Sequence, residues 1–154
     1  MSETIEIRLA ALGITIPEAA APVANYVPYA QSGALLFTSG QLPLVNGKLI
    51  HAGLLGDGLN VVEGQEAARA SAINVLAQAK AALGDLNRIK RIVKITIFVA
   101  STPDFIEHHL VANGASDLFV AVLGDAGRHA RSAVGMASLP FNAPVEIEAI
   151  IEAA

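Results

Sequence analysis

The sequence contains no cysteine, and aromatic residues make up only 5% of its 154 positions. Without cysteine the chain cannot form a disulfide, use a thiol nucleophile, or bind zinc or an iron–sulfur cluster through thiolates. Charged residues are also scarce, at 16% against 53% apolar residues, which is the reverse of a disordered chain. Such an apolar fraction serves either a large internal core or a surface that meets another subunit.

Long hydrophobic runs are missing as well, and none approaches the roughly 20 residues that a membrane-spanning helix needs. The first residues carry acidic side chains and no basic segment ahead of a long apolar one, so we expect no signal peptide and a cytoplasmic location. The net charge of −4 disfavours nucleic-acid binding, which needs a basic surface for phosphates. The single basic cluster, Asn87–Lys94, leads into a predicted strand and is interpreted as a solvated edge.

Local patterns predict three helices. A short one ends near Gly13, and apolar residues at i, i+4, i+7 and i+8 predict a long one over about Val62 to Leu83. A second long helix, ending at about Leu123, has a start signal formed by an N-cap, a proline and an acidic residue: Thr102, Pro103 and Asp104.

Alternating β-branched and apolar residues predict strands at about 34–43, 91–101, 130–138 and 145–153. In the second of these, one face is predicted to carry the residues Val93, Ile95, Ile97 and Val99. The order of elements predicts an α+β or α/β sandwich in which two helices cover one face of a mixed sheet. Strand residues 133–137 are apolar on both sides, so a homo-oligomer is the economical way to bury the second face.

Three motifs that invite a chemical interpretation have simpler ones. The glycines of residues 53–58 fit no phosphate-binding pattern and are interpreted as a flexible loop. His108 and His109 are adjacent in a predicted helix, about 100° apart, so they do not converge on a metal. We therefore expect no metal site and interpret both as histidines on the helix surface. Ser39 is not the centre of a G-x-S-x-G motif, and we interpret it as a turn serine or a ligand-binding hydroxyl.

Arg131 and Glu146 are the most informative pair. Arginine offers two parallel donors and keeps its charge at physiological pH, which suits a small carboxylate ligand. Glu146 begins a segment on the neighbouring predicted strand, where a carboxylate near a bound substrate can orient water or transfer a proton. The residues alone also permit a structural Arg–Glu pair or a solvated strand face, and they favour this simpler interpretation over a catalytic one. Arg128 and His129 are interpreted as loop residues.

Three segments occur together in order: ANYVPYAQSGALLFTSGQLPL, IVKITIFVASTPDF and ARSAVGMASLPFNAPVEIEAI. Their combination resembles the RidA (YjgF) family of enamine/imine deaminases over about residues 25–150. The resemblance implies a single chorismate-mutase-like α+β domain over residues 1–154, with two long helices packed on one face of a mixed sheet. It also implies a homotrimer with a site in each cleft between subunits.

Carried over by position, the family's catalytic residues fall on Arg131 and Glu146. Its substrate-binding residues fall on Tyr26, Ser39, Gly40 and Asn113. The resemblance then implies a hydrolase that needs no cofactor or metal, like 2-iminobutanoate/2-iminopropanoate deaminase. Its substrates would be 2-iminoacids, including imines derived from 2-aminoacrylate, which it hydrolyses to 2-oxoacids and ammonia.

The chain also departs from the compact members of the family. It has an N-terminal extension of about residues 1–20 and longer stretches around residues 107–118 and 123–132, and Ala133 replaces a frequent cysteine. The longer loops motivate an alternative, a non-catalytic trimer that binds a small carboxylate or has a regulatory role. RNA cleavage, associated with some relatives, is disfavoured by the acidic balance.

Overall fold

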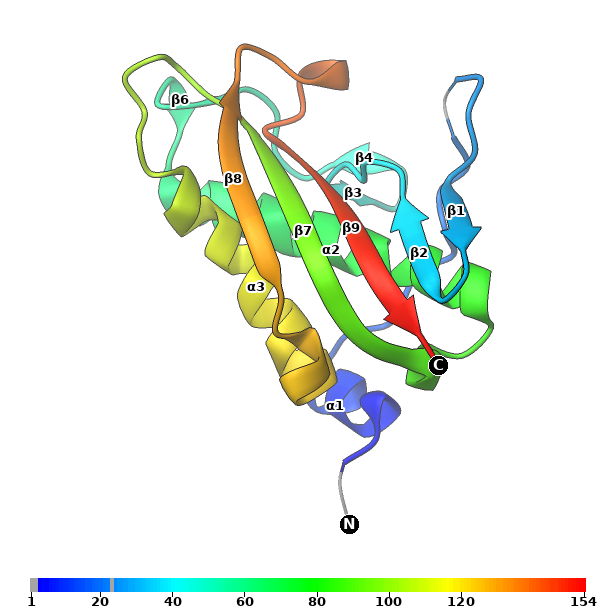
Figure 1. Ribbon diagram of the computed structural model, residues 1–154. Helices are drawn as coiled ribbons and strands as arrows, with labels where there is room; N and C mark the ends of the chain where they lie inside the picture. The colour runs from blue at the N-terminus through cyan, green and yellow to red at the C-terminus, as the bar shows by residue number, and fades with distance from the viewer. Residues whose placement is uncertain (1–2, 23) are drawn as a thin grey trace.

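The computed structural model describes residues 3–22 and 24–154, so residues 1 and 2 of the predicted extension and Val23 lie outside the described residues. Five strands form one mixed sheet in the order β1-β2-β9-β7-β8, in which β7 and β8 are parallel and the other neighbours antiparallel (Figure 1). Their bounds are Tyr29–Ser32 (β1), Leu35–Thr38 (β2), Ile89–Ala100 (β7), Ala130–Met136 (β8) and Val145–Ala153 (β9).

Two short strand pairs lie in the connection from β2 to the first long helix. They are β3 (Leu44–Val45) with β4 (Lys48–Leu49), and β5 (Leu54–Leu55) with β6 (Gly58–Leu59). The second pair belongs to the glycine-containing segment that was predicted as a flexible loop, so this segment is a compact turn instead.

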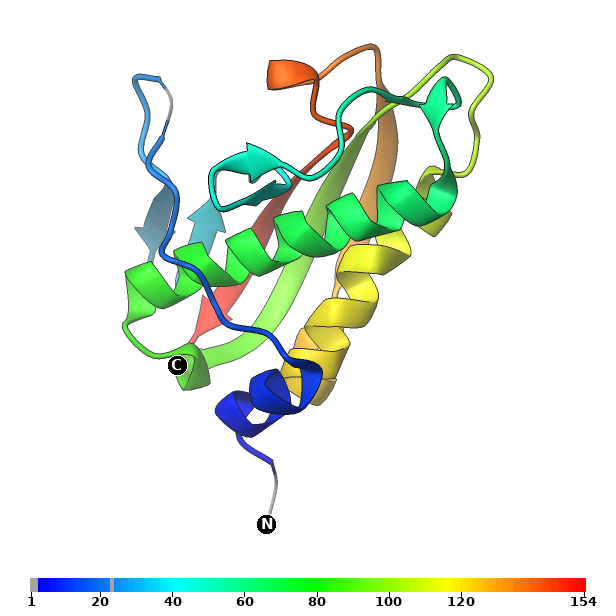
Figure 2. The ribbon, with the colours of Figure 1, turned by 180° about the vertical axis from the view of Figure 1, so that it is seen from behind.

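Two long helices, α2 (Val61–Leu83) and α3 (His108–Leu123), cross the same face of the sheet (Figure 2). A capping box starts α2, where Asn60 and Glu63 exchange side-chain to backbone hydrogen bonds of 2.9 and 3.1 Å. The two helices approach closely because Gly114 has no side chain: a Cβ there would lie 2.8 Å from the Gln65 carbonyl carbon. The predicted arrangement of two helices on one face is confirmed.

The predicted start of α3 is wrong. Thr102, Pro103 and Asp104 form an isolated turn, in which the Thr102 hydroxyl donates to the Asp104 carboxylate at 2.7 Å. The helix begins six residues later, at His108. The same polar residues that favour an N-cap also favour turns, and here the turn formed.

One strand face also differs from the alternation in the sequence. The pairing of β7 with β9 shifts between Ile92 and Lys94, which places Val93 in a bulge. Ile92 is therefore fully buried beneath the helices, whereas Val93 is only half-buried. Alternation holds from Ile95 onward, where Ile95, Ile97 and Val99 face the core as predicted.

The short helix α1 (Ile5–Leu12) packs at the end of α3 and ends at Gly13, as predicted. Arg8 of α1 donates to the Val122 carbonyl at 3.4 Å, and the buried Ile5 and Leu9 join the main core. The α1 part of the N-terminal extension is thus part of the helical layer.

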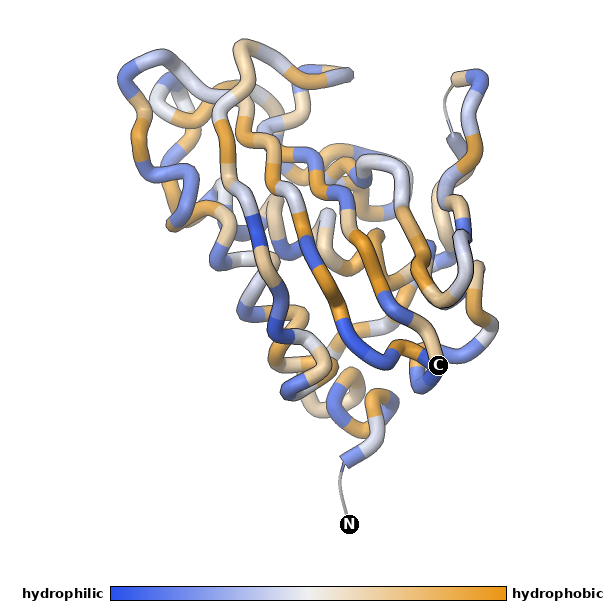
Figure 3. The backbone as a smooth tube through the Cα atoms, in the orientation of Figure 1, coloured by the Kyte–Doolittle hydropathy of each residue, from blue (hydrophilic) through white to orange (hydrophobic). Residues whose placement is uncertain are grey.

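The sheet face opposite the helices is not covered by any described residue of the chain. Phe37 and Val134 on this face are about 40% exposed. In Figure 3 hydrophobic residues extend along the central strands, and the hydrophilic start of β7 lies at the end of the sheet near the C-terminus. β8 is an edge strand of the sheet, and β7 is its partner among the described strands. None of the described helices is long and apolar enough to cross a membrane.

Candidate active site

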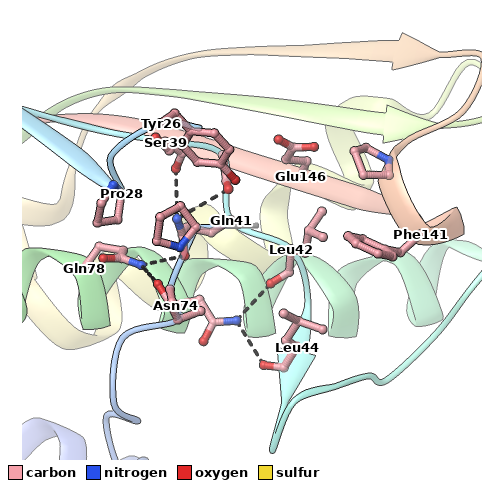
Figure 4. Close-up of a pocket in the computed structure, with 15 residues that line it drawn as sticks. Tyr26, Pro28, Ser39, Gln41, Leu42, Leu44, Asn74, Gln78, Phe141 and Glu146 are labelled. Atoms are coloured by element: carbon pink, nitrogen blue, oxygen red, sulfur yellow. Dashed lines mark hydrogen bonds between the residues drawn. The ribbon is translucent and has the colours of Figure 1, made fainter. Parts of the chain in front are cut away.

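A cavity of about 80 Å³ lies beside the C-terminal end of β2 and the start of β9. Four of the predicted site residues line it together: Tyr26, Ser39, Gly40 and Glu146. Figure 4 shows Glu146 and Phe141 on one side of this cavity and the amide groups of Gln41, Asn74 and Gln78 along its floor.

The segment after β2 is anchored directly beside Glu146. The backbone of Gln41 exchanges two hydrogen bonds with Ile147, of 2.8 and 3.0 Å. The Ser39 hydroxyl donates to the Val27 carbonyl at 2.6 Å, which ties the segment that carries Tyr26 to the same place. Within the chain, Ser39 therefore acts as a turn serine that bonds nearby backbone. It also lines the cavity, and its role in ligand binding stays a prediction.

Three amide side chains support the floor, and none of them was predicted from the sequence. Gln41 donates to the Ser39 carbonyl at 3.1 Å, and Gln78 donates to the Gln41 side-chain oxygen at 3.3 Å. Asn74 donates to the Leu42 carbonyl at 2.9 Å. Asn74 and Gln78 are four residues apart on the packed face of α2, and Gln78 is only 1% exposed. The sequence did carry a signal for Asn74 and Gln78, because two polar residues four positions apart on the apolar face of a helix indicate a shared buried role.

Glu146 is half-buried in the cavity wall. Burial raises the pKa of its carboxyl group above the ordinary value, and the nearby charge of Glu148 raises it further. Both glutamates lie on one face of β9, with Val145, Ile147 and Ala149 buried on the other, as predicted. A carboxyl group with a raised pKa can hold a proton for transfer at higher pH than a solvated glutamate can.

Arg131 lies in a second cluster, formed by β8 and α3. Its Nη1 donates to Asn113 Oδ1 at 2.9 Å and to Ser116 Oγ at 3.0 Å, and its Nη2 donates to the His109 carbonyl at 3.1 Å. These bonds use three of the five guanidinium N–H groups, so Nε–H and one Nη2–H have no partner among the described residues. The cluster holds the arginine in one orientation and leaves two N–H donors without a described partner.

The two clusters do not meet within one chain. Arg131 pairs with Ile95, whose side chain faces the helices, whereas Glu146 pairs with Phe98 on the opposite face. Their strands are consecutive in sequence, but β7 lies between them in the sheet, so the interpretation of neighbouring strands is wrong. A structural Arg131–Glu146 ion pair within the chain is thereby excluded.

Comparison with known proteins identifies the family. Residues 6–152 match the family described as "YjgF/chorismate mutase-like, putative endoribonuclease". The chain belongs to the YjgF family. The Trypanosoma cruzi protein TCP17 is 53% identical over 152 residues, covering 98% of this chain and 95% of its own length.

Two solved structures extend the comparison. The crystal structure of the Agrobacterium tumefaciens protein Atu1372 is 58% identical and covers 97% of this chain and 92% of its own, with a TM-score of 0.92. The structure of Escherichia coli TdcF with bound serine is 30% identical and covers 89% and 94%, with a TM-score of 0.63. The resemblance to the RidA (YjgF) family and its α+β fold are therefore confirmed.

Within this YjgF-family fold, the predicted site residues separate into the two clusters described above, and their roles stay predictions. Ser116 beside Arg131 was not predicted from the sequence, and His129, interpreted there as a loop residue, contacts Ser116 in this cluster. Ser116 follows Asn113 by three residues and so shares its helix face, which was an available signal. His108 is not a simple surface residue: its Nε2 lies 3.0 Å from the Ser101 hydroxyl. The described residues contain no group of three or more His, Asp or Glu placed to hold a metal ion.

Proposed function

We propose that this protein is a hydrolase that converts 2-iminoacids to 2-oxoacids and ammonia. The observation that carries the proposal is the Arg131 cluster, in which three hydrogen bonds fix the guanidinium while two N–H donors stay available. Two parallel donors match the two oxygens of a carboxylate. The serine bound to TdcF supports this choice, because serine also carries a carboxylate and a nitrogen on the same carbon.

The reaction needs little beyond positioning and proton transfer. Water attacks the imine carbon, so that a C–O bond forms and the C=N π electrons move to nitrogen. One proton passes from the attacking oxygen to nitrogen, which gives a carbinolamine with one OH and one NH2 group. The hydroxyl proton then passes to nitrogen as the C=O bond forms and the C–N bond breaks, so ammonia leaves and a 2-oxoacid remains. Glu146 is suited to this proton transfer because its pKa is raised by burial and by Glu148. No cofactor enters the scheme.

The site is completed by a second copy of the chain. Arg131 and Glu146 lie on opposite faces of one sheet, so a single small substrate cannot contact both in one chain. The edge of β8 that pairs with no described strand, and the apolar side chains of Phe37 and Val134, provide a surface for association. A cyclic homotrimer places the Arg131 cluster of one subunit against the Glu146 cavity of the next.

The first test measures turnover. An amino-acid oxidase generates 2-iminoacids in the assay, and release of the 2-oxoacid is followed with and without the protein. Arg131→Ala removes charged hydrogen bonds worth about 1.5–3 kcal/mol, which predicts a loss of about 10- to 150-fold in kcat/KM. Arg128→Ala is the matched control, because it removes the same charge from an exposed position three residues away.

The outcomes separate the candidate functions. No acceleration over buffer by the wild-type protein, or equal rates for wild type and Arg131→Ala, contradicts the proposal. If calorimetry nevertheless shows 2-oxoacid binding that Arg131→Ala abolishes, the protein is the non-catalytic carboxylate-binding alternative.

A second test concerns the shared site. Arg131→Ala and Glu146→Gln subunits are each expected to have strongly reduced activity as pure proteins. When they are unfolded together and refolded as mixed trimers, about one site in four combines an intact Arg131 with an intact Glu146. Recovery of activity on mixing is the expected result. Failure to recover activity, or a monomer in light scattering, contradicts the intersubunit site.

A further inference from the structure

His129 belongs to the Arg131 cluster but has no role in the reaction as written. Its Nε2 lies 2.8 Å from the Ser116 hydroxyl oxygen, and its Nδ1 lies 2.6 Å from the Gly127 carbonyl oxygen. The ring also packs edge-on against Phe119, with centroids 5.9 Å apart and planes at 81°. Both ring nitrogens and the ring surface are therefore engaged, two residues before Arg131.

The hydrogen-bond partners determine the tautomer. A carbonyl oxygen only accepts, so Nδ1 must carry the proton that is donated to Gly127. Neutral imidazole has one N–H, which leaves Nε2 as an acceptor. The Ser116 hydroxyl accepts from Arg131 Nη1 at 3.0 Å and can then donate its own proton to Nε2. The result is one directed chain from Arg131 through Ser116 and His129 to the backbone.

Protonation of His129 would break this direction. Nε2 would become a donor, and the Ser116 oxygen would then face two donors without an acceptor for its own proton. Burial lowers the pKa of His129, the positive charge of Arg131 lowers it further, and the bond to Gly127 opposes both effects. Arg131 is the charged group beside the imidazole, and the neutral form that the hydrogen bonds require is also the form that burial favours.

The geometry points to His129 as a positioning residue that acts through Ser116 to hold the Arg131 guanidinium in its carboxylate-binding orientation. This inference rests on the proposed function for its ligand class. Without the acceptor on His129, the Ser116 hydroxyl group can rotate. The hydrogen bond from Arg131 Nη1 to the Ser116 oxygen then no longer has a fixed geometry. Asn113 and the His109 carbonyl alone would then hold Arg131.

The test is a double-mutant cycle in the full-length protein, with 2-oxobutanoate as the probe and calorimetry to measure its Kd. We expect His129→Phe and Ser116→Ala each to weaken binding about 3- to 10-fold, as for loss of one hydrogen bond. His129→Phe should have no further effect in the Ser116→Ala background. His129→Gln, whose amide oxygen can accept from Ser116, should restore most of the affinity.

The pH profile supplies a second readout. The affinity of the wild type for 2-oxobutanoate should fall as the pH is lowered and His129 becomes protonated. The affinity of His129→Gln should not show this fall, because glutamine does not titrate. His51→Phe is the matched control, since His51 lies near Glu63 and Glu66, away from the Arg131 cluster. Additive effects of His129→Phe and Ser116→Ala, or unchanged binding in a folded His129→Phe protein, would overturn the inference.

A ligand-free measurement keeps the inference separate from the proposed function. NMR of the Arg131 Nε–H and Nη–H signals, assigned with Arg131→Lys, should show restricted guanidinium rotation in the wild type. His129→Phe and Ser116→Ala should both release it, and ¹⁵N shifts should show the Nδ1–H tautomer. If 2-iminoacids are not hydrolysed but these NMR results hold, the proposed function fails and the positioning role stands. Restricted rotation that survives in both variants overturns the positioning role.

Discussion

Gly40 provides a sharp test of Glu146, because the two residues are packed directly against each other. A Cβ placed on Gly40 would lie 2.7 Å from Cδ and 2.8 Å from Cγ of Glu146, and closer still to its Oε1. Ordinary contact begins at 3.4 Å, so Gly40→Ala forces the glutamate side chain to move. Gly40 does not have a positive φ, so alanine causes no backbone strain there and the nearest conflict is with the Glu146 side chain.

The size of the effect follows from this clash. The carboxylate has to be displaced by about 1 Å, and misplacement of that order can cost about 100-fold in rate, or about 2.7 kcal/mol on the barrier. Glu146 is half-buried and its side chain is flexible, so it can move toward solvent at little cost to the fold. We therefore expect kcat/KM to fall by about 100-fold while the unfolding free energy changes by less than about 1 kcal/mol.

The assay is 2-oxoacid release from oxidase-generated 2-iminoacids, combined with urea denaturation of the same preparations. The Glu146→Gln variant and the double variant that combines Gly40→Ala with Glu146→Gln are measured in parallel. If Gly40→Ala acts through Glu146, the double variant is no slower than Glu146→Gln alone. A folded Gly40→Ala protein with kcat/KM within twofold of wild type would refute a catalytic role for the Glu146 carboxylate at this position.

Three further predictions concern stability, each measured by urea denaturation. Because burial and Glu148 raise the pKa of Glu146 above 4.5, its contribution to stability is complete below about pH 4.5 and is lost as the pH rises through the folded-state pKa. Glu146→Gln should therefore become stabilising relative to wild type between pH 4 and pH 8, and a pH-independent difference would contradict this reasoning. Asn60→Ala should cost about 1 kcal/mol by removing the cap of α2, with Asn60→Asp close to wild type. Phe119→Ala should cost about 3–5 kcal/mol, because Phe119 is fully buried, and a cost under 1 kcal/mol would show that its surroundings collapse to fill the cavity.

Much of the candidate site could be predicted because its parts lie in short, recognisable segments. Tyr26, Ser39, Gly40 and Glu146 come from two segments of the family pattern, and they line one cavity. The amide floor could not be predicted in the same way. Gln78 supports the cavity through a hydrogen bond to Gln41, and that contact depends on how α2 crosses the sheet.

The sequence by itself determined the three helices, four of the strands and their order in the chain, because apolar periodicity acts over a few positions. It also determined the buried side of β9 and of β7 from Ile95 onward. Tertiary structure decided the start of α3, the bulge at Val93 and the strand order that places β7 between β8 and β9. It also turned Arg131 away from Glu146 and toward Ser116 and His129. Each of these outcomes depends on packing between residues far apart in sequence, where competing local preferences of similar size are resolved by burial.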